Sequence, residues 1–104
     1  MSSTDENVAT KAAFELGCDH MQNNRTQDAA RSFELAAKQG HTKAKNMFGV
    51  LIMQMGGDIH IAYDWICQAA DEGNDVAMNN RDTLKRVLDS GNPGPYRLPL
   101  FFSW

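Results

Sequence analysis

The side chains best suited to chemistry are three histidines and two cysteines, spread along a chain of 104 residues. His20, His41 and His60 are too far apart in the sequence to form a metal-binding pair on one helix. Cys18 has no evident base beside it, and neither Cys18 nor Cys67 belongs to the paired cysteines of a zinc site. We therefore expect no catalytic residue, no metal site and no cofactor.

Composition and charge narrow the class of protein further. The chain has 42% hydrophobic and 22% charged residues, as folded globular domains do, and its net charge is −3. A nucleic-acid binder would normally carry a basic surface, so we expect no nucleic-acid partner. The opening MSSTDENVATK lacks the pattern of a signal peptide, and no apolar stretch has the length of a membrane helix. We expect a cytoplasmic protein with no membrane partner and two reduced, buried cysteines; a disulfide between the cysteines is the less favoured alternative.

Apolar residues recur at helical spacing, and Gly, Asn and Asp interrupt the pattern four times before residue 91. Five helices are predicted, and most of them begin at a residue able to cap a helix. The expected starts are a capping box at Ser3-x-x-Glu6, then Thr26, Thr42, Asp58 and Asn74-Asp75. The expected ends are Asn23-Asn24, Gly40, Gly56-Gly57, Gly73 and Gly91.

Two stretches of the chain echo one another at a distance of 33 residues. SFELAAKQGH at 32–41 and WICQAADEGN at 65–74 both place Ala-Ala before two polar residues, Gly, and His or Asn. Upstream of them, AAFELG at 12–17 matches AKNMFG at 44–49. A period of this length is typical of a two-helix solenoid unit. The mid-helix Gly17 and Gly49 cost about 1 kcal/mol each relative to Ala, which close packing against the second helix of the same unit would explain.

These motifs resemble the Sel1-like repeat, a relative of the tetratricopeptide repeat. That family carries A-x-x-x-L-G in a first helix and W-[FYIL]-x-x-A-A-x-x-G-[HN] in a second. The resemblance covers about residues 12–83 and implies an all-α fold: a short right-handed solenoid of antiparallel helix pairs. It predicts a domain at 1–91 with repeats at about 9–41 and 42–74 and a capping helix at 75–90. Ser32 and Arg81-Asp82 depart from the family pattern, so the array is about two and a half repeats long.

In Sel1-like and tetratricopeptide proteins the first helices line a concave face that typically holds a partner. The resemblance implies a face with an apolar middle and a polar rim, as suits a protein interface. Register with Gly17 and Gly49 places these residues on it: Lys11, Phe14, Cys18, Met21, Gln22, Asn46, Val50, Met53, Gln54, Asn79, Thr83 and Arg86. The alternative is that several of them, Met21 and Val50 above all, belong to the core.

The last segment, 92–104, is rich in prolines and aromatics. Its prolines exclude a regular helix, and a disordered tail would be poor in aromatic residues. We expect this segment to pack in an extended form on the domain or on a partner. The residues expected to dock it are Tyr96, Leu98, Phe101, Phe102 and Trp104. It could cover an end of the array, fill the groove, or pair two chains.

The sequence thus predicts a non-catalytic protein–protein interaction module that binds another protein through its concave face. A bacterial immunity or antitoxin-like protein is one candidate, because such proteins are often small, acidic single domains; its partner would be a toxin. A signalling component is another candidate partner. The alternative function is a self-assembling scaffold or homodimer that uses the aromatic tail.

Overall fold

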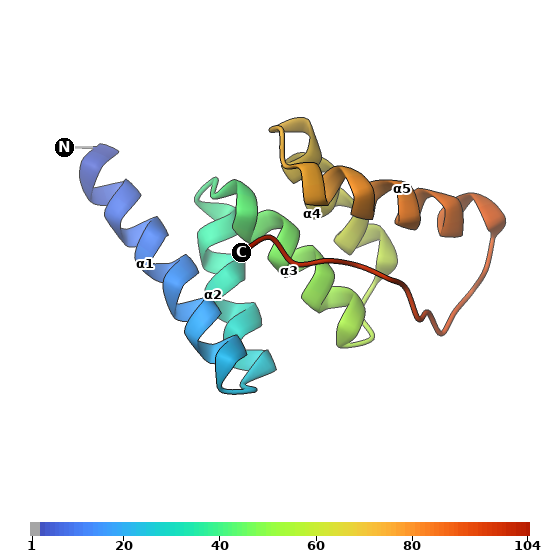
Figure 1. Ribbon diagram of the computed structural model, residues 1–104, viewed down its shortest axis with the longest axis horizontal. Coiled ribbons are helices and arrows are strands. Elements are labelled where there is room, and N and C mark those ends of the chain that lie inside the picture. The colour runs from blue at the N-terminus through green and yellow to red at the C-terminus, as the bar shows by residue number, and fades with distance from the viewer. Residues whose placement is uncertain (1–2) are drawn as a thin grey trace.

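A computed structural model describes residues 3–104 of the chain, with side chains from residue 8 onward. This part forms five helices and contains no strand. They are α1 (Ser3–Gln22), α2 (Thr26–Lys38), α3 (Thr42–Gln54), α4 (Ile59–Asp71) and α5 (Asp75–Ser90). Each helix packs against the next one in sequence, which gives an elongated array of 47 × 29 × 18 Å (Figure 1). The predicted all-α fold is confirmed; its right-handed sense stays a prediction.

The capping box expected at Ser3 and Glu6 lies outside the residues whose side chains are described. Within residues 3–104, none of the helices combines the length and the hydropathy that crossing a bilayer requires.

The repeated Gly-His/Asn dipeptide joins two helices through one local geometry. Gly40 adopts a φ of +97° at the end of α2, a region that glycine enters without steric cost. The N–H of Gly40 donates to the carbonyl of Ala37 at 2.9 Å, and the N–H of His41 donates to that of Ala36 at 3.0 Å. Gly73 and its neighbours repeat this pattern at the end of α4. Both joints are therefore Schellman turns, which satisfy the last carbonyls of the preceding helix.

The residue after each of these glycines then caps the next helix. His41 Nδ1 accepts a hydrogen bond from Ala44 N at 3.2 Å, and Asn74 Oδ1 accepts one from Ala77 N at 2.8 Å. A side-chain acceptor at this position satisfies one of the free N–H groups that begin a helix. The Gly-His/Asn motif thus ends one helix and caps the beginning of the next.

The caps predicted at Thr26 and Thr42 are wrong, because each threonine is the first helical residue rather than the residue before it. Arg25 precedes α2 and makes no side-chain cap bond. The Thr42 hydroxyl instead donates to Glu72 Oε1 at 2.6 Å, and the hydrogen bonds from Lys45 and Thr42 lower the pKa of Glu72. The cap predicted at Asp58 is confirmed, with its Oδ1 accepting from the N–H at position 60 at 2.7 Å.

Gly17 and Gly49 lie where a first helix touches the second helix of the same unit. A Cβ atom built on Gly17 would lie 2.6 Å from Phe33 Cε1. One built on Gly49 would lie 2.6 Å from Ile66 Cγ1 and 3.0 Å from the carbonyl oxygen of Ala62. Such distances are shorter than van der Waals contact, so the prediction of close helix packing is confirmed at both glycines.

The core consists of two clusters that meet at α3. One contains Phe33 and Met47 and lies among α1, α2 and α3. The other contains Val50, Ile66 and Leu84 and lies among α3, α4, α5 and the tail. Val50 is completely buried, which favours its interpretation as a core residue. The α3 helix therefore contributes to both clusters, with Met47 in the first and Val50 in the second.

The stability of the joint between α2 and α3 depends on pH through His41. Its ring stacks on Phe14 with a centroid distance of 4.3 Å, and burial, aided by the charge of Lys43, lowers the pKa of His41. The cap bond needs a neutral Nδ1, because a protonated imidazole can only donate. Since the pKa is lower in the native than in the unfolded chain, this contribution to stability is fully present above about pH 6.5 and is lost as the pH falls through the native value.

Replacing His41 by the residue that the second unit uses should remove this pH dependence. His41→Asn keeps a cap acceptor without a titrating ring, so we expect the urea midpoint to vary less between about pH 5 and 7.5. His60→Asn, at an exposed position on α4, is the matched control and should keep the wild-type slope. Equal slopes for wild type and His41→Asn would rule out this role of His41.

Candidate functional site

The tail, residues 92–104, lies along α3 and runs in the opposite direction to that helix (Figure 1). Near the start of α3, Lys43 Nζ donates to the main-chain oxygen of Trp104 at 2.8 Å. Near its end, Met53 and Gln54 line a pocket together with tail residues, Leu98 among them. We call the surface of α3 and α5 that the tail covers the groove.

Two buried asparagines hold the tail by its main chain. Asn80 Oδ1 accepts from Phe101 N at 2.9 Å, and Asn80 Nδ2 donates to Phe101 O at 2.8 Å. Asn80 Nδ2 also donates to Asn46 Oδ1 at 2.8 Å, and Asn46 Nδ2 donates to Phe101 O at 3.1 Å. Both asparagine side chains are completely buried. A primary amide offers a donor and an acceptor, so Asn80 recognises the N–H and C=O of one residue whatever its side chain is.

Ser103 extends this network to the second helix joint. Its hydroxyl accepts from Asn46 Nδ2 at 2.8 Å and donates to Asn74 Oδ1 at 3.0 Å. Its N–H points to Met47 Sδ at 3.2 Å. Asn74 is also the N-cap of α5, so one amide oxygen serves both the fold and the tail. Every side-chain donor and acceptor of the buried Asn46 and Asn80 has a partner, as buried polar networks require.

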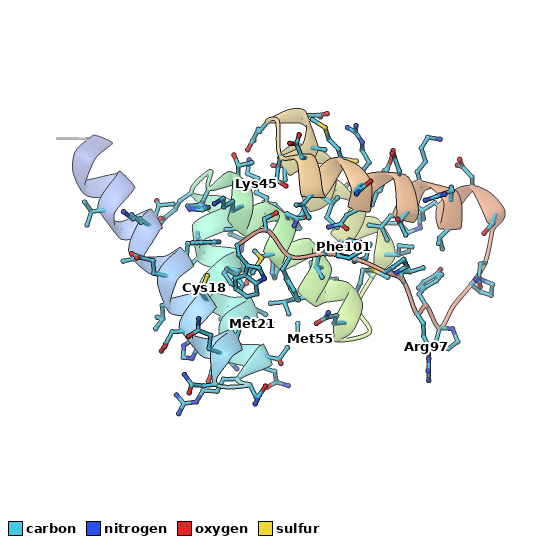
Figure 2. All side chains as sticks on the ribbon, in the orientation of Figure 1. Cys18, Met21, Lys45, Met55, Arg97 and Phe101 are labelled. Atoms are coloured by element: carbon cyan, nitrogen blue, oxygen red, sulfur yellow. The ribbon has the colours of Figure 1, made fainter. Side chains whose placement is uncertain are left out.

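The tail side chains alternate between the groove and solvent, as in an extended segment. Leu98, Leu100 and Phe102 are half-buried against the second cluster. Arg97 is exposed and points away from the helices, whereas Phe101 lies where the tail passes over α3 (Figure 2). The groove therefore combines apolar sockets for alternate side chains with a clamp, by which we mean Asn46 and Asn80 bonded to the main chain of Phe101.

The residues predicted to dock the tail divide into two kinds. Tyr96, Leu98 and Phe102 pack against the second cluster. Phe101 and Trp104 remain 56% and 60% exposed, so these two residues are held by their main chains rather than by buried rings. The sequence pattern marked aromatic rings as anchors, whereas much of the polar anchoring goes through backbone groups.

The four α3 residues predicted for the concave face lie on the stripe that the tail follows. Asn46 is in the clamp, and Val50 forms part of the cluster beneath it. Met53 and Gln54 line the pocket of about 180 Å³ between α3 and the tail. The helical register of α3, with steps of three and four residues, brings these positions onto one face.

On α1, the three apolar residues predicted for this face, Phe14, Cys18 and Met21, are half-buried against the first cluster. Lys11 and Gln22 are exposed. Lys11 and Phe14 line an open pocket beside His41, Thr42 and Lys43, close to where Trp104 contacts α3. This pocket adjoins the groove at Lys43, outside the surface that the tail covers.

The cysteines are free, and each is half-buried rather than buried as predicted. Burial, with a smaller effect of the carboxylate of Glu15, raises the pKa of Cys18. A raised pKa lowers the thiolate fraction, which a nucleophilic cysteine needs. No three His, Cys, Asp or Glu side chains in the described part of the chain lie together as a metal site would need.

On α5 the predicted face is displaced by one residue. Asn79 and Arg86 are exposed, and the half-buried Thr83 bonds to the carbonyl of Asn79 at 3.3 Å. Asn80 faces the tail instead, and one residue changes the direction of a helical side chain by about 100°. The repeat register matched Asn79 with Asn46. The signal for Asn80 was an asparagine inside a helix, where that residue is unfavourable unless its amide has a partner.

Comparisons with known proteins leave the groove to be interpreted from its own geometry. No protein-family model, no curated protein and no solved structure matches the chain. What stands out is a groove whose floor is two buried, mutually bonded amides and whose occupant is an extended segment of the same chain.

Proposed function

We propose that this chain is a non-catalytic protein–protein interaction module that binds a partner protein through the groove of α3 and α5 and the adjoining face of α1. The observation that carries the proposal is the double hydrogen bond between Asn80 and the main chain of Phe101. An extended peptide bound in this way gains affinity from main-chain bonds and specificity from alternate side-chain sockets.

The open pocket that adjoins the groove on α1 supports the proposal. Lys11 and Lys43 flank the open pocket around Phe14, which the tail does not line. An apolar centre with a polar, charged rim is the usual anatomy of an interface. A partner therefore has a surface to contact on α1 before it reaches the part of the groove beneath the tail.

We further propose that the chain is a right-handed Sel1-like solenoid of about two and a half repeats. Three features that recur in both units support this assignment: the Schellman turn at the glycine, the cap from His41 or Asn74, and the mid-helix glycine at a helix contact. A cytoplasmic immunity or antitoxin-like protein with a toxin partner is the narrower proposal; a signalling partner is its alternative.

A second candidate function is self-assembly through the tail. It is favoured by the exposed rings of Phe101 and Trp104, because large exposed aromatics commonly mark association surfaces. In a homodimer or scaffold these rings would be buried by a second copy.

A site-specific cross-linking experiment tests the proposal. A photoreactive residue replaces Lys11 on the α1 face or, as the matched control, Gln68 on the exposed face of α4. In cells of the source organism, we expect a defined cross-link to one partner protein from position 11 and none from position 68. Cross-links of equal yield from both positions would contradict the proposal, and a product with the mass of two copies would favour self-assembly.

A further inference from the structure

We infer that the tail is a removable occupant of the groove, and that it is displaced by an extended segment of another protein with tail-like chemistry. That segment would carry apolar side chains at alternate positions and a free N–H where Phe101 has one. This inference rests on the proposed function and adds to it the kind of partner segment and how its access is controlled.

The groove stays formed without the tail. Asn46 and Asn80 bond directly to each other at 2.8 Å, and both belong to helices whose neighbours hold them in place. When the tail leaves, the two amides keep this mutual bond and expose their remaining donors and acceptor to the groove. A preorganised site of this kind binds a ligand with little cost of ordering.

The tail fits the groove incompletely. Its hydrogen bonds to the helices come from Phe101, Ser103 and Trp104, while 96–100 contribute apolar packing. A pocket of about 180 Å³ remains between this apolar part and α3, and two large rings of the tail face solvent. Space under the bound segment and unburied aromatic area are what a better-fitting segment would use.

Residues 91–95, with the sequence GNPGP, form a hinge between α5 and the rest of the tail. Gly91 ends α5 with a φ of +74°, and the hydrogen bonds of the hinge in the described chain reach no farther than the last turn of α5 and Tyr96. Gly94 N donates to Asn92 Oδ1 at 2.9 Å, and the Tyr96 hydroxyl donates to Asn92 O at 2.6 Å. The part from 96 onward can therefore leave the groove as a unit while α5 remains intact.

The tail competes with any other segment for the groove. A segment tethered by a short hinge has an effective concentration of the order of millimolar at its own site. A free peptide of the same sequence must compete with it, so its apparent affinity is reduced by the small fraction of molecules with an open groove. Weakening only the tail should therefore improve binding of a free peptide, whereas weakening the groove should reduce it.

The experiment uses the full chain and a labelled nine-residue peptide, YRLPLFFSW, which copies residues 96–104. Phe101→Pro in the protein removes the N–H that bonds to Asn80 and leaves the groove unchanged. We expect this variant to bind the peptide with a dissociation constant at least about tenfold lower than that of wild type. Adding Asn80→Ala should weaken binding at least about tenfold again, whereas adding Asn79→Ala should not. The peptide with Phe101→Pro should not bind.

Other results overturn the inference. Equal binding by wild type and Phe101→Pro means that the tail does not compete, and no binding by either folded protein means that the groove does not accept such segments. Wild-type dimers that disappear in Phe101→Pro would make a second copy the occupant. If Phe101→Pro fails to fold by circular dichroism, Ser103→Ala replaces it with the same expected direction. A partner cross-linked from position 11 would leave the proposed function standing in each of these cases.

Discussion

Asn80→Ala is expected to lower the free energy of unfolding by about 2–4 kcal/mol, because it removes three hydrogen bonds, one buried and two part-buried, worth roughly 0.5–1.5 kcal/mol each and leaves the Phe101 N–H without its acceptor. The matched control is Asn79→Ala, one position earlier on α5, where the side chain is exposed. Its effect should stay within about 0.5 kcal/mol, since an exposed substitution creates no unsatisfied group. Urea denaturation of both variants supplies the comparison.

The difference in stability between Asn80→Ala and Asn79→Ala isolates the contribution of the buried amide of Asn80. If both variants lost equal stability, the clamp could not account for the effect, because Asn79 is outside it and both substitutions should gain the same helix propensity. If neither lost stability, the tail would not be held by Asn80 in solution.

Gly17→Leu is expected to destabilise the protein by about 2–3 kcal/mol, despite the higher helix propensity of leucine. Even a single Cβ at this position would lie 2.6–2.9 Å from three atoms of the Phe33 ring, which is completely buried and cannot move into solvent. Ala12→Leu places the same side chain on an exposed position of α1 and should leave the midpoint of thermal unfolding nearly unchanged. Equal melting temperatures for Gly17→Leu and wild type would disprove the close contact between α1 and α2.

Helix number and helix ends were predictable from the sequence because their signals are local. Positive φ angles at Gly40 and Gly73 are required by the turn itself, so the glycines mark the ends directly. The packing role of Gly17 was predictable because a glycine in the middle of a helix is unfavourable unless a neighbouring helix packs closely against it. In each case a single residue carries information about its own backbone.

The starts of the helices were less predictable because neighbouring residues compete for the same cap. His41 and Thr42 can both accept a hydrogen bond from a free N–H, and the Schellman turn at Gly40 decides which of them occupies the cap position. Helix propensity and residue type alone could not choose between them.

The site was only partly predictable, since it depends on contacts between distant segments. The α3 stripe through Asn46 followed from the repeat register, whereas Asn80 lies one position away from the register of the third, incomplete unit. The bonds from Phe101 and Ser103 to the groove use main-chain and small polar groups that carry no apolar signal. A composition rich in aromatics could indicate that the tail packs, but not which atoms anchor it.

Amide hydrogen exchange at Phe101 is the most direct measurement of whether the tail occupies the groove. The N–H of Phe101 is bonded to a completely buried acceptor, whereas Arg97 lies in an exposed part of the tail. We predict that the Phe101 amide exchanges at least about tenfold more slowly than the Arg97 amide after correction for sequence. This protection should disappear in Asn80→Ala while amides in the middle of α3 stay protected. Equal exchange at the two positions in the wild-type protein would contradict a tail held in the groove by Asn80.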